Sequence, residues 1–552
     1  MRNSKITILI AFIALVVSYS YGQPGPIEAG EGIAVVSTTY GKVRGYIDDG
    51  IFAFKGIPYA KAKRFMPPEV PDKWDGVRQC QIYGPQAMQS TAQNWTGQSD
   101  YNFGFLFNRE PMDEHESFVL NVWSQGINDG KKRPVWVWLH GGGFNSGSGN
   151  QLPCFDGCSM ADKGDIVVVT LNHRLNVLGA TDLRGLGGKY SESVNLGMQD
   201  IVAALQWVHN NIENFGGDPN SVTIDGQSGG GGKVSRLMAM PAAAGKLFHR
   251  AIVQSGSLTT LRSGDDSKAY GLAFAAALGV NAQNAEKLND FTYDELVAAA
   301  RLTSDVLGAA GSSASGATLC VDGKYITQNP FDPTPADFAK DIPMLIGSNL
   351  NEFEYYNRAL VTPKTIDEVK ATLAERYGAE NVDKYISLFQ AAYPDTKEPH
   401  RMLVFDNQVR DMAVQQGTLK SKQGGAPVYE FLFTWQSPVN DGSLGAAHGM
   451  ELPFMFNNIE FARTLTGCGK DAYELEDKIS SAWINFIKTG NPNAENLPGW
   501  EPYTAENGAT MIFDNECKVV NNHDKALMDF INSFPQIISF GPRRGQVKEV
   551  KK

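Results

Sequence analysis

The segment Gly226-Gln-Ser-Gly-Gly230 places a serine between glycines in the pattern G-x-S-x-G. The residue pattern predicts a short strand just before it, at Ser221–Ile224, and a helix just after it, over Gly229–Met240. A serine on a tight turn from strand to helix projects its hydroxyl above a sheet, and flanking glycines permit the strained turn. Ser228 is therefore our candidate nucleophile.

Two nucleotide-binding interpretations of the same glycine run fail. A P-loop requires G-x-x-x-x-G-K-[ST]. Lys233 does follow a glycine, but Gln227 stands at the first glycine position and Val234 stands where Ser or Thr is required. The spacing of a dinucleotide fingerprint is not met either. We expect no organic cofactor.

A second glycine run, His140–Phe144, follows the predicted strand Pro134–Leu139. Ester hydrolysis passes through a tetrahedral oxyanion that fixed donors must stabilise, and removing one such donor typically costs about 2.7–4 kcal/mol. Bare glycines allow backbone N–H groups to approach that oxygen. We predict an oxyanion hole formed by the N–H groups of Gly142, Gly143 and Gly229.

A serine nucleophile needs a base, and the base needs an orienting acid. His448 stands in a loop of small residues, Gly445–Pro453, after a predicted strand. The other histidines downstream of the serine lie in helical or polar surroundings: His249, His400 and His523. His448 is therefore the candidate base.

The candidate acid is Glu352, which follows the predicted strand Pro343–Gly347. A loop at the edge of a sheet could present its carboxylate to the base. Glu354 is a close rival by position, so the residues alone leave two candidates.

Strands and helices alternate along the chain that must position these residues. Buried strands are predicted at Pro134–Leu139, Asp165–Leu171, Ser221–Ile224, Ala251–Gln254, Pro343–Gly347 and Val428–Thr434, and helices over Asn195–Ile212 and Gly229–Met240. This alternation predicts parallel strands with helices on both faces. The region Leu261–Ala339 is mostly helical in pattern, and we interpret it as an excursion from one continuous domain.

Composition limits the classes of partner. The chain has 552 residues, 42% of them hydrophobic, and a net charge of -11. It can therefore bury a large core, and its acidic balance argues against nucleic acid as a partner. The six cysteines are not spaced as zinc ligands, so we predict no metal site. Cys154 and Cys158 are close enough in sequence to pair, and that alternative stays open.

The first residues have the order of a secretory signal peptide. Arg2 and Lys5 precede an apolar run, Ile6–Val17, which is shorter than the roughly 20 residues of a membrane-spanning helix. We predict a signal peptide over residues 1–22, with a membrane anchor as the alternative. The mature protein is expected to be secreted or periplasmic, and no later segment is apolar enough to span a bilayer.

Together these motifs resemble the type-B carboxylesterases, the cholinesterase-like branch of the α/β-hydrolases, nearly end to end. The segments that carry the resemblance, besides the serine turn, are Phe52–Ala60, Trp74–Val77, His140–Phe144, Asn172–Leu175, Asn195–Asp200, Asn214–Pro219, Gln254–Gly256, Gly347–Glu352, Ala447–Pro453, Thr489–Pro492 and Trp500.

The resemblance implies an α/β-hydrolase fold, in which helices flank a large, mostly parallel central sheet and helical insertions lie over the active site. It implies one domain over residues 23–545, followed by a basic tail at 546–552. The family roles fall on Ser228 as nucleophile, Glu352 as acid and His448 as base, with Ser255 as a secondary hydrogen-bonding residue. The implied function is an exported carboxylic ester hydrolase that forms an acyl-enzyme on a small-molecule ester, without a cofactor.

The chain departs from the family pattern in three places. Gln227 stands where the family commonly has Glu, and Gly229 where it commonly has Ala. Ala87 and Ser117 occupy the positions of the family's early disulfide. A neutral Gln227 removes a charge that could stabilise the imidazolium or attract cationic substrates, which weakens a choline-ester interpretation.

Two alternatives accompany the esterase hypothesis. A lipase or amidase would use the same three residues, and a non-catalytic binding protein of this fold would lack one or more of them. Asn94 lies in a formal glycosylation sequence. Four aromatic residues flank the motifs and could line an acyl pocket, although aromatic residues beside a catalytic loop are more often part of the core: Phe144, Phe353, Phe454 and Phe456.

Overall fold

The computed structural model describes residues 25–89, 100–105, 111–353, 362, 364–405 and 407–535. The predicted signal peptide, Asn94, Glu354 and the basic tail at 546–552 lie outside these residues.

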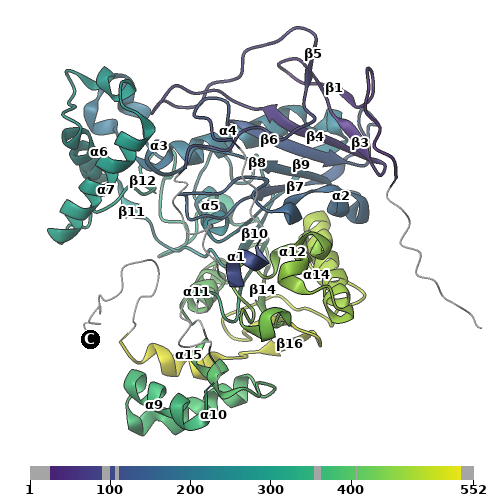
Figure 1. The fold of residues 1–552 in the computed structure, drawn as a ribbon, viewed down its shortest axis with the longest axis vertical. Coiled ribbons are helices and arrows are strands. Elements are labelled where there is room, and N and C mark those ends of the chain that lie inside the picture. The colour runs from purple at the N-terminus through teal and green to yellow at the C-terminus, as the bar shows by residue number, and fades with distance from the viewer. Residues whose placement is uncertain are drawn as a thin grey trace, which may run out of the picture.

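An 11-stranded sheet passes through the centre of the described part of the chain (Figure 1). Its strands, in chain order, are β3 (Tyr46–Asp48), β4 (Ile51–Pro58), β6 (Val119–Ser124), β7 (Arg133–Leu139), β8 (Val167–Leu171), β9 (Gly217–Gln227), β10 (Arg250–Gln254), β13 (Met344–Asn349), β14 (Val428–Phe433), β15 (Ala509–Phe513) and β16 (Lys518–Asn521). Their spatial order is β16-β15-β14-β13-β10-β9-β7-β8-β6-β4-β3. All pairings from β8 through β15 are parallel, and the antiparallel pairings lie at the two ends. The mostly parallel central sheet is therefore confirmed.

Smaller pairings lie outside this sheet. The strands β1 (Val35–Ser37), β2 (Lys42–Arg44) and β5 (Val77–Gln79) form a three-stranded sheet, and β11 (Arg262–Ser263) pairs with β12 (Cys320–Val321).

Alternation along the central strands divides the core between the two faces of the sheet. In β7, Trp136 and Trp138 belong to one hydrophobic cluster, while Val135, Val137 and Leu139 belong to the other. Successive side chains of a strand point to opposite faces, so a strand that is apolar throughout must be covered on both sides.

The helices are α1 (Asp100–Gly104), α2 (Cys158–Gly164), α3 (Asn176–Ala180), α4 (Leu196–Asn211), α5 (Gly229–Leu237), α6 (Gly264–Ala277), α7 (Tyr293–Ala309), α9 (Ile366–Tyr377), α10 (Val382–Ala392), α11 (Asn407–Lys422), α12 (Leu452–Met455), α13 (Arg463–Thr466), α14 (Lys470–Thr489) and α15 (Lys525–Asn532). Apolar side chains of α4 and α5 pack in the cluster with Val135, whereas those of α12 and α14 pack in the cluster with Trp136. The predicted helices on both faces are confirmed.

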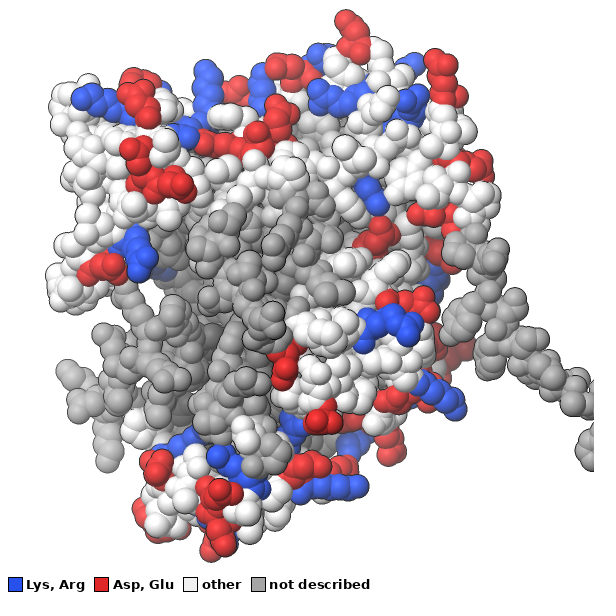
Figure 2. Space-filling view, viewed as in Figure 1, with Lys and Arg blue, Asp and Glu red and all other residues white. Residues whose placement is uncertain are grey.

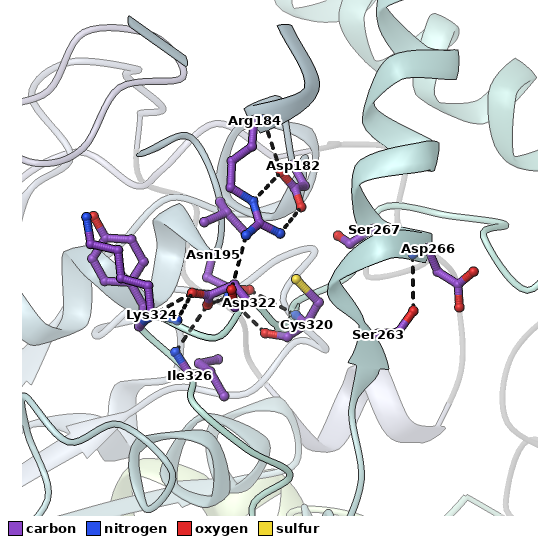
Figure 3. Close-up of polar contacts among 12 residues, drawn as sticks. Asp182, Arg184, Asn195, Ser263, Asp266, Ser267, Cys320, Asp322, Lys324 and Ile326 are labelled. Atoms are coloured by element: carbon purple, nitrogen blue, oxygen red, sulfur yellow. Dashed lines mark hydrogen bonds and ion pairs between the residues drawn. The ribbon is translucent and has the colours of Figure 1, made fainter. Parts of the chain in front are cut away.

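The region 261–339 is mostly helical, as the sequence predicts, and α6 and α7 project from one side of the molecule (Figure 1). Its returning strand is held at the start of α4, where the Asn195 side chain pairs with both backbone groups of Cys320 at 2.9 Å (Figure 3). Arg184 bridges Asp182 and the carbonyl of Asp322. These bonds connect the excursion to the same strand–helix units that carry the site.

Several details differ from the sequence patterns. Strand β9 begins at Gly217, four residues before the predicted start. Helix α5 ends at Leu237 instead of Met240. The patterns do not predict β15 and β16, which extend the sheet after α14. All six cysteines are free thiols, so Cys154 and Cys158 are not paired.

Candidate active site

Ser228 lies on the turn between β9 and α5. Its backbone has φ 57° and ψ −124°, a conformation that few non-glycine residues adopt, and its N–H donates to the carbonyl of Gln254 at 2.8 Å. Strained residues of this kind persist only where surrounding structure holds them, and they are concentrated at functional sites. The serine therefore stands at the end of a central strand, on the edge where the neighbouring strands also end.

The loops after β13 and β14 bring Glu352 and His448 together. The backbone N–H of His448 donates to the carbonyl of Glu352 at 3.0 Å, within a parallel bridge between Glu352 and Ala447. Nδ1 of His448 lies 2.5 Å from Oε2 of Glu352, and both side chains are buried. The other carboxylate oxygen accepts the N–H of Asn349 at 2.8 Å. This pair has the geometry of a carboxylate that orients an imidazole.

The second nitrogen of the imidazole faces the serine turn. Nε2 of His448 lies 3.1 Å from the side-chain amide nitrogen of Gln227, the residue before Ser228. With Nδ1 donating to Glu352, Nε2 carries the lone pair and accepts from this amide. Phe353 covers the ring, with 4.0 Å between the ring centroids.

A second buried carboxylate lies behind the acid. Glu451 accepts a hydrogen bond from the Asn349 side chain at 2.5 Å, and Asn349 also contacts Glu352. Burial, and then the charge of Glu352, raises the pKa of Glu451 to about 7. Asn349 and Glu451 both lie within segments that carry the family resemblance, which is the signal that could have identified them.

A third buried carboxylate supports the serine turn from below. Asp225 accepts hydrogen bonds from Trp136 and Trp483 at 3.1 Å and from Gln254 at 2.7 Å. Burial raises the pKa of Asp225 to about 7, although the three donors act in the opposite direction. Sequence reasoning missed this residue because its partners come from distant segments.

The glycine run after β7 lies against the start of α5. Three successive residues have positive φ: Gly142 at 89°, Gly143 at 58° and Phe144 at 61°. A Cβ on Gly229 would lie only 2.5 Å from the Gly143 nitrogen, so the two segments are in close contact. Among the described residues, no backbone acceptor takes up the N–H groups of Gly142, Gly143 or Gly229. The structure thus brings the three predicted donors to one place.

Ser255 follows β10, the strand between those that lead to Ser228 and Glu352. Its N–H donates to the carbonyl of Gly347 at 2.8 Å, and its φ is 48°. Its hydroxyl is buried and has no hydrogen-bond partner in the described part of the chain. Ser255 therefore lies at the same edge of the sheet as Ser228 and Glu352.

The four aromatic candidates separate into two pairs. Phe353 lies on His448, and Phe144 belongs to the glycine run. Phe454 and Phe456 are instead fully buried in the aromatic core, where Phe456 lies 4.7 Å from Trp136 between ring centroids. For these two the core alternative is confirmed, because they pack against the face of the sheet.

Two further properties concern the described residues only. They contain no group of three or more His, Cys, Asp or Glu side chains placed to hold a metal ion. No helix among them combines the length and apolar character needed to cross a membrane. On the face in Figure 2, basic and acidic side chains are interspersed, without an extended basic patch.

The parallel sheet, the serine turn and the Glu–His pair define a hydrolase of the α/β-hydrolase class. The chain belongs to the carboxylesterase family, because the model of that family matches residues 33–531. It is 33% identical to para-nitrobenzyl esterase of Bacillus subtilis over 497 residues, covering 88% of this chain and 96% of the relative. It is 31% identical to phenmedipham hydrolase of Pseudarthrobacter oxydans, covering 87% and 95% of the two chains.

Solved structures agree with this assignment. An esterase from Clostridium hathewayi, described as able to hydrolyse aliphatic aromatic polyesters, superimposes with a TM-score of 0.83 at 35% identity, covering 91% of this chain and 98% of that one. A para-nitrobenzyl esterase superimposes with a TM-score of 0.72 at 30% identity, covering 91% and 99%. The α/β-hydrolase fold and the activity class, a carboxylic ester hydrolase of small-molecule esters, are therefore confirmed.

Proposed function

We propose that this carboxylic ester hydrolase acts through Ser228, His448 and Glu352 and forms a covalent acyl-enzyme on Ser228. The observation that carries the proposal is the 2.5 Å contact between His448 and Glu352, with the other ring nitrogen directed to the residue next to Ser228. In this arrangement Nδ1 of the imidazole is held by a buried carboxylate, and Nε2 carries a lone pair that can accept a proton.

In the first half of the reaction, the Ser228 hydroxyl attacks the ester carbonyl and His448 takes its proton at Nε2. Glu352 stabilises the resulting imidazolium through Nδ1. The negative oxygen of the tetrahedral intermediate is bound by the N–H groups of Gly142, Gly143 and Gly229. The alcohol leaves with the proton returned by His448.

In the second half, water replaces the alcohol. His448 takes a proton from water, the resulting hydroxide attacks the acyl-enzyme, and Ser228 regains its proton as the acid leaves. The Gln227 amide also contacts Nε2. Gln227 is therefore a secondary residue, whose amide competes with the serine hydroxyl for the lone pair of this nitrogen. Ser255, whose buried hydroxyl has no partner among the described residues, is a second such residue.

The substrates are proposed to be uncharged esters with an aromatic part. Gln227 supplies no anionic charge beside the serine to attract a cationic ester. The para-nitrobenzyl esterase and the enzyme that can hydrolyse aliphatic aromatic polyesters both have aromatic groups in their described targets. We also propose that residues 1–22 export the protein to the periplasm or the medium, which sequencing the N-terminus of protein from the cell exterior would test.

The test is hydrolysis of p-nitrophenyl esters and of an anilide analogue by the mature protein and by Ser228→Ala. We expect ester hydrolysis that is lost to background in Ser228→Ala and retained in Ser313→Ala, an exposed serine on the helical excursion. Burst release of one p-nitrophenol per protein would mark the acyl-enzyme. Ester hydrolysis that persists in folded Ser228→Ala would refute the proposal, and faster cleavage of the anilide would favour the amidase alternative.

A further inference from the structure

The segment that follows β7 is strained and must be held from outside. Three successive residues, Gly142 to Phe144, adopt positive φ, and the last of them is not a glycine. Glycine adopts positive φ without steric cost, so the strain lies at Phe144, which persists in this conformation only where neighbouring structure compensates for its cost. The contacts at the two ends of this segment therefore decide whether its N–H groups keep their position.

At its start, the segment is held by a buried lysine. Lys233, on α5, is fully buried, and its amino group donates to the carbonyl of His140 at 2.6 Å. This carbonyl belongs to the residue just before the three glycines. A short hydrogen bond from a charged donor is among the stronger contacts in proteins, so it fixes the backbone at this point.

At its other end, the segment is held through Phe144. The Lys233 amino group lies 5.3 Å from the centre of the Phe144 ring, and the guanidinium of Arg236 lies 4.6 Å from it. Cations over an aromatic face attract the ring. The carbonyl of Phe144 also accepts the N–H of Asn176 at 2.7 Å. Two cations from one helix thus contact both ends of the strained segment.

Among the described residues, no carboxylate pairs with either of these two basic side chains. Lys233 and Arg236 are both buried, and neither forms an ion pair with a carboxylate in the part of the chain that the structure describes. Burial lowers the pKa of Lys233 well below its usual value and that of Arg236 to about 9. Uncompensated buried cations are costly, and a negative charge that forms nearby reduces that cost.

Two histidines beside Lys233 add no charge to this cluster. His140 and His173 stack with 5.0 Å between ring centroids, and each directs Nδ1 to a backbone carbonyl. Burial first, and then the Lys233 charge, lowers both of their pKa values, so both rings are neutral. Their Nε2 atoms are buried and have no hydrogen-bond partner among the described residues. Each carries a lone pair and no proton, so neither ring repels the nearby amine.

We propose that Lys233 is a positioning residue that holds the oxyanion segment in its strained conformation, with Arg236 as its partner on the Phe144 ring. The inference rests on the proposed function, because it assigns a support to the proposed oxyanion hole. The amine donates to the His140 carbonyl in either protonation state. In its protonated form it also attracts the negative oxygen that forms in front of the segment.

The test compares Lys233→Met with the parent protein on p-nitrophenyl butyrate. Methionine keeps the apolar stem and removes the donor and the charge. We expect kcat to fall 10- to 100-fold with KM within about twofold, because the segment contacts the transition state more strongly than the bound ester. The affinity of a trifluoromethyl ketone, which mimics the tetrahedral intermediate, should fall by the same factor as kcat.

Lys246→Met is the matched control. Lys246 is an exposed lysine that also donates to a carbonyl, that of Pro241 at 2.9 Å, and its replacement should leave both constants unchanged. The unfolding temperature of Lys233→Met, measured beside that of the parent, shows whether a loss of kcat comes from unfolding. If Lys233→Met does not fold, Arg236→Met should lower kcat and inhibitor affinity together.

Two outcomes are distinguishable. A folded Lys233→Met with parental kcat and parental affinity for the trifluoromethyl ketone would overturn the inference. Activity that survives in Ser228→Ala in the same assay would instead overturn the proposed function.

Discussion

Restoring the residue that the family commonly carries after the nucleophile should damage this protein. A Cβ on Gly229 would lie 2.5 Å from the nitrogen of Gly143 and 2.9 Å from its Cα, whereas ordinary contact begins at 3.4 Å. The atoms in the way belong to the backbone, so no side chain can rotate to make room. In Gly229→Ala the glycine segment must retreat by about 0.9 Å, the difference between the first and last of these distances.

A displacement of that size falls on two of the proposed oxyanion donors at once. A shift of about 1 Å in a reacting geometry can reduce a rate about 100-fold, and loss of one donor costs about 100- to 1,000-fold in kcat. We therefore expect kcat of Gly229→Ala on p-nitrophenyl butyrate to fall about 100-fold, with KM changed much less. Steady-state kinetics at saturating ester, with the unfolding temperature of each variant, provide the measurement.

The control is Gly417→Ala, at a buried glycine of α11. There a Cβ would meet its nearest neighbour, a methyl group of Ile346, at an ordinary 3.6 Å. Alanine stabilises a helix relative to glycine by roughly 0.5–1 kcal/mol, so this variant should keep parental kcat and be slightly more stable. If Gly229→Ala folds and retains parental kcat, the close approach of the two segments does not set the position of the donors, and our reasoning about this contact is wrong.

Gln227→Glu places a carboxylate where an amide now lies 3.1 Å from Nε2 of His448. A negative charge there favours the protonated imidazole, so the fall of kcat/KM on the acid side of the pH–rate profile should move to higher pH by about 1–3 units. An acid side that does not move would contradict this contact. For Glu451, whose pKa rises from 4.5 to about 7, the stabilising protonated form is complete below pH 4.5 and is lost as pH rises through 7. Glutamine at position 451 cannot ionise, so the free energy of unfolding of Glu451→Gln should match that of the parent near pH 4.5. At pH 9 it should exceed the parental value by up to about 3 kcal/mol, or about 3 °C in unfolding temperature for a chain of this size. A difference in unfolding temperature that does not grow with pH would contradict this prediction. Alkylation of the denatured, unreduced protein should modify six thiols, and a count of four would mean that two of them, Cys154 and Cys158 first, are paired.

Local sequence was sufficient where local structure decides the outcome. The β9–α5 turn could be predicted because a buried strand, a serine between glycines and a helix are adjacent in the chain. The strands β7, β8, β10, β13 and β14 were predictable for a similar reason, since apolar runs bounded by turn residues fit only a covered strand. Assigning Glu352 and His448 needed more, because their pairing depends on two loops that are 96 residues apart. There the family resemblance supplied what spacing could not.

The features that escaped prediction depend on contacts between distant segments. Strands β15 and β16 are short, and they form because the edge of β14 is available to them. Phe456 is part of the core because its ring packs against Trp136, a contact that no local pattern encodes. By its neighbours along the chain, Lys233 is only the lysine of an incomplete P-loop pattern, and nothing in that pattern indicates that its amine reaches His140.

The glycines of α5 explain why a lysine can be buried there at all. A Cβ on Gly230 would lie 2.0 Å from the carbonyl oxygen of Leu139, so only a glycine lets the helix come this close to the end of β7. The same close approach removes the alanine that the family commonly has at Gly229 and places the Lys233 amine within 2.6 Å of the His140 carbonyl. One helix then supplies the serine turn at its first residue and the support of the opposite segment one turn later. The departure at Gly229 and the burial of Lys233 therefore belong to one packing arrangement, in which helix and glycine segment are held together by backbone contact and a buried amine.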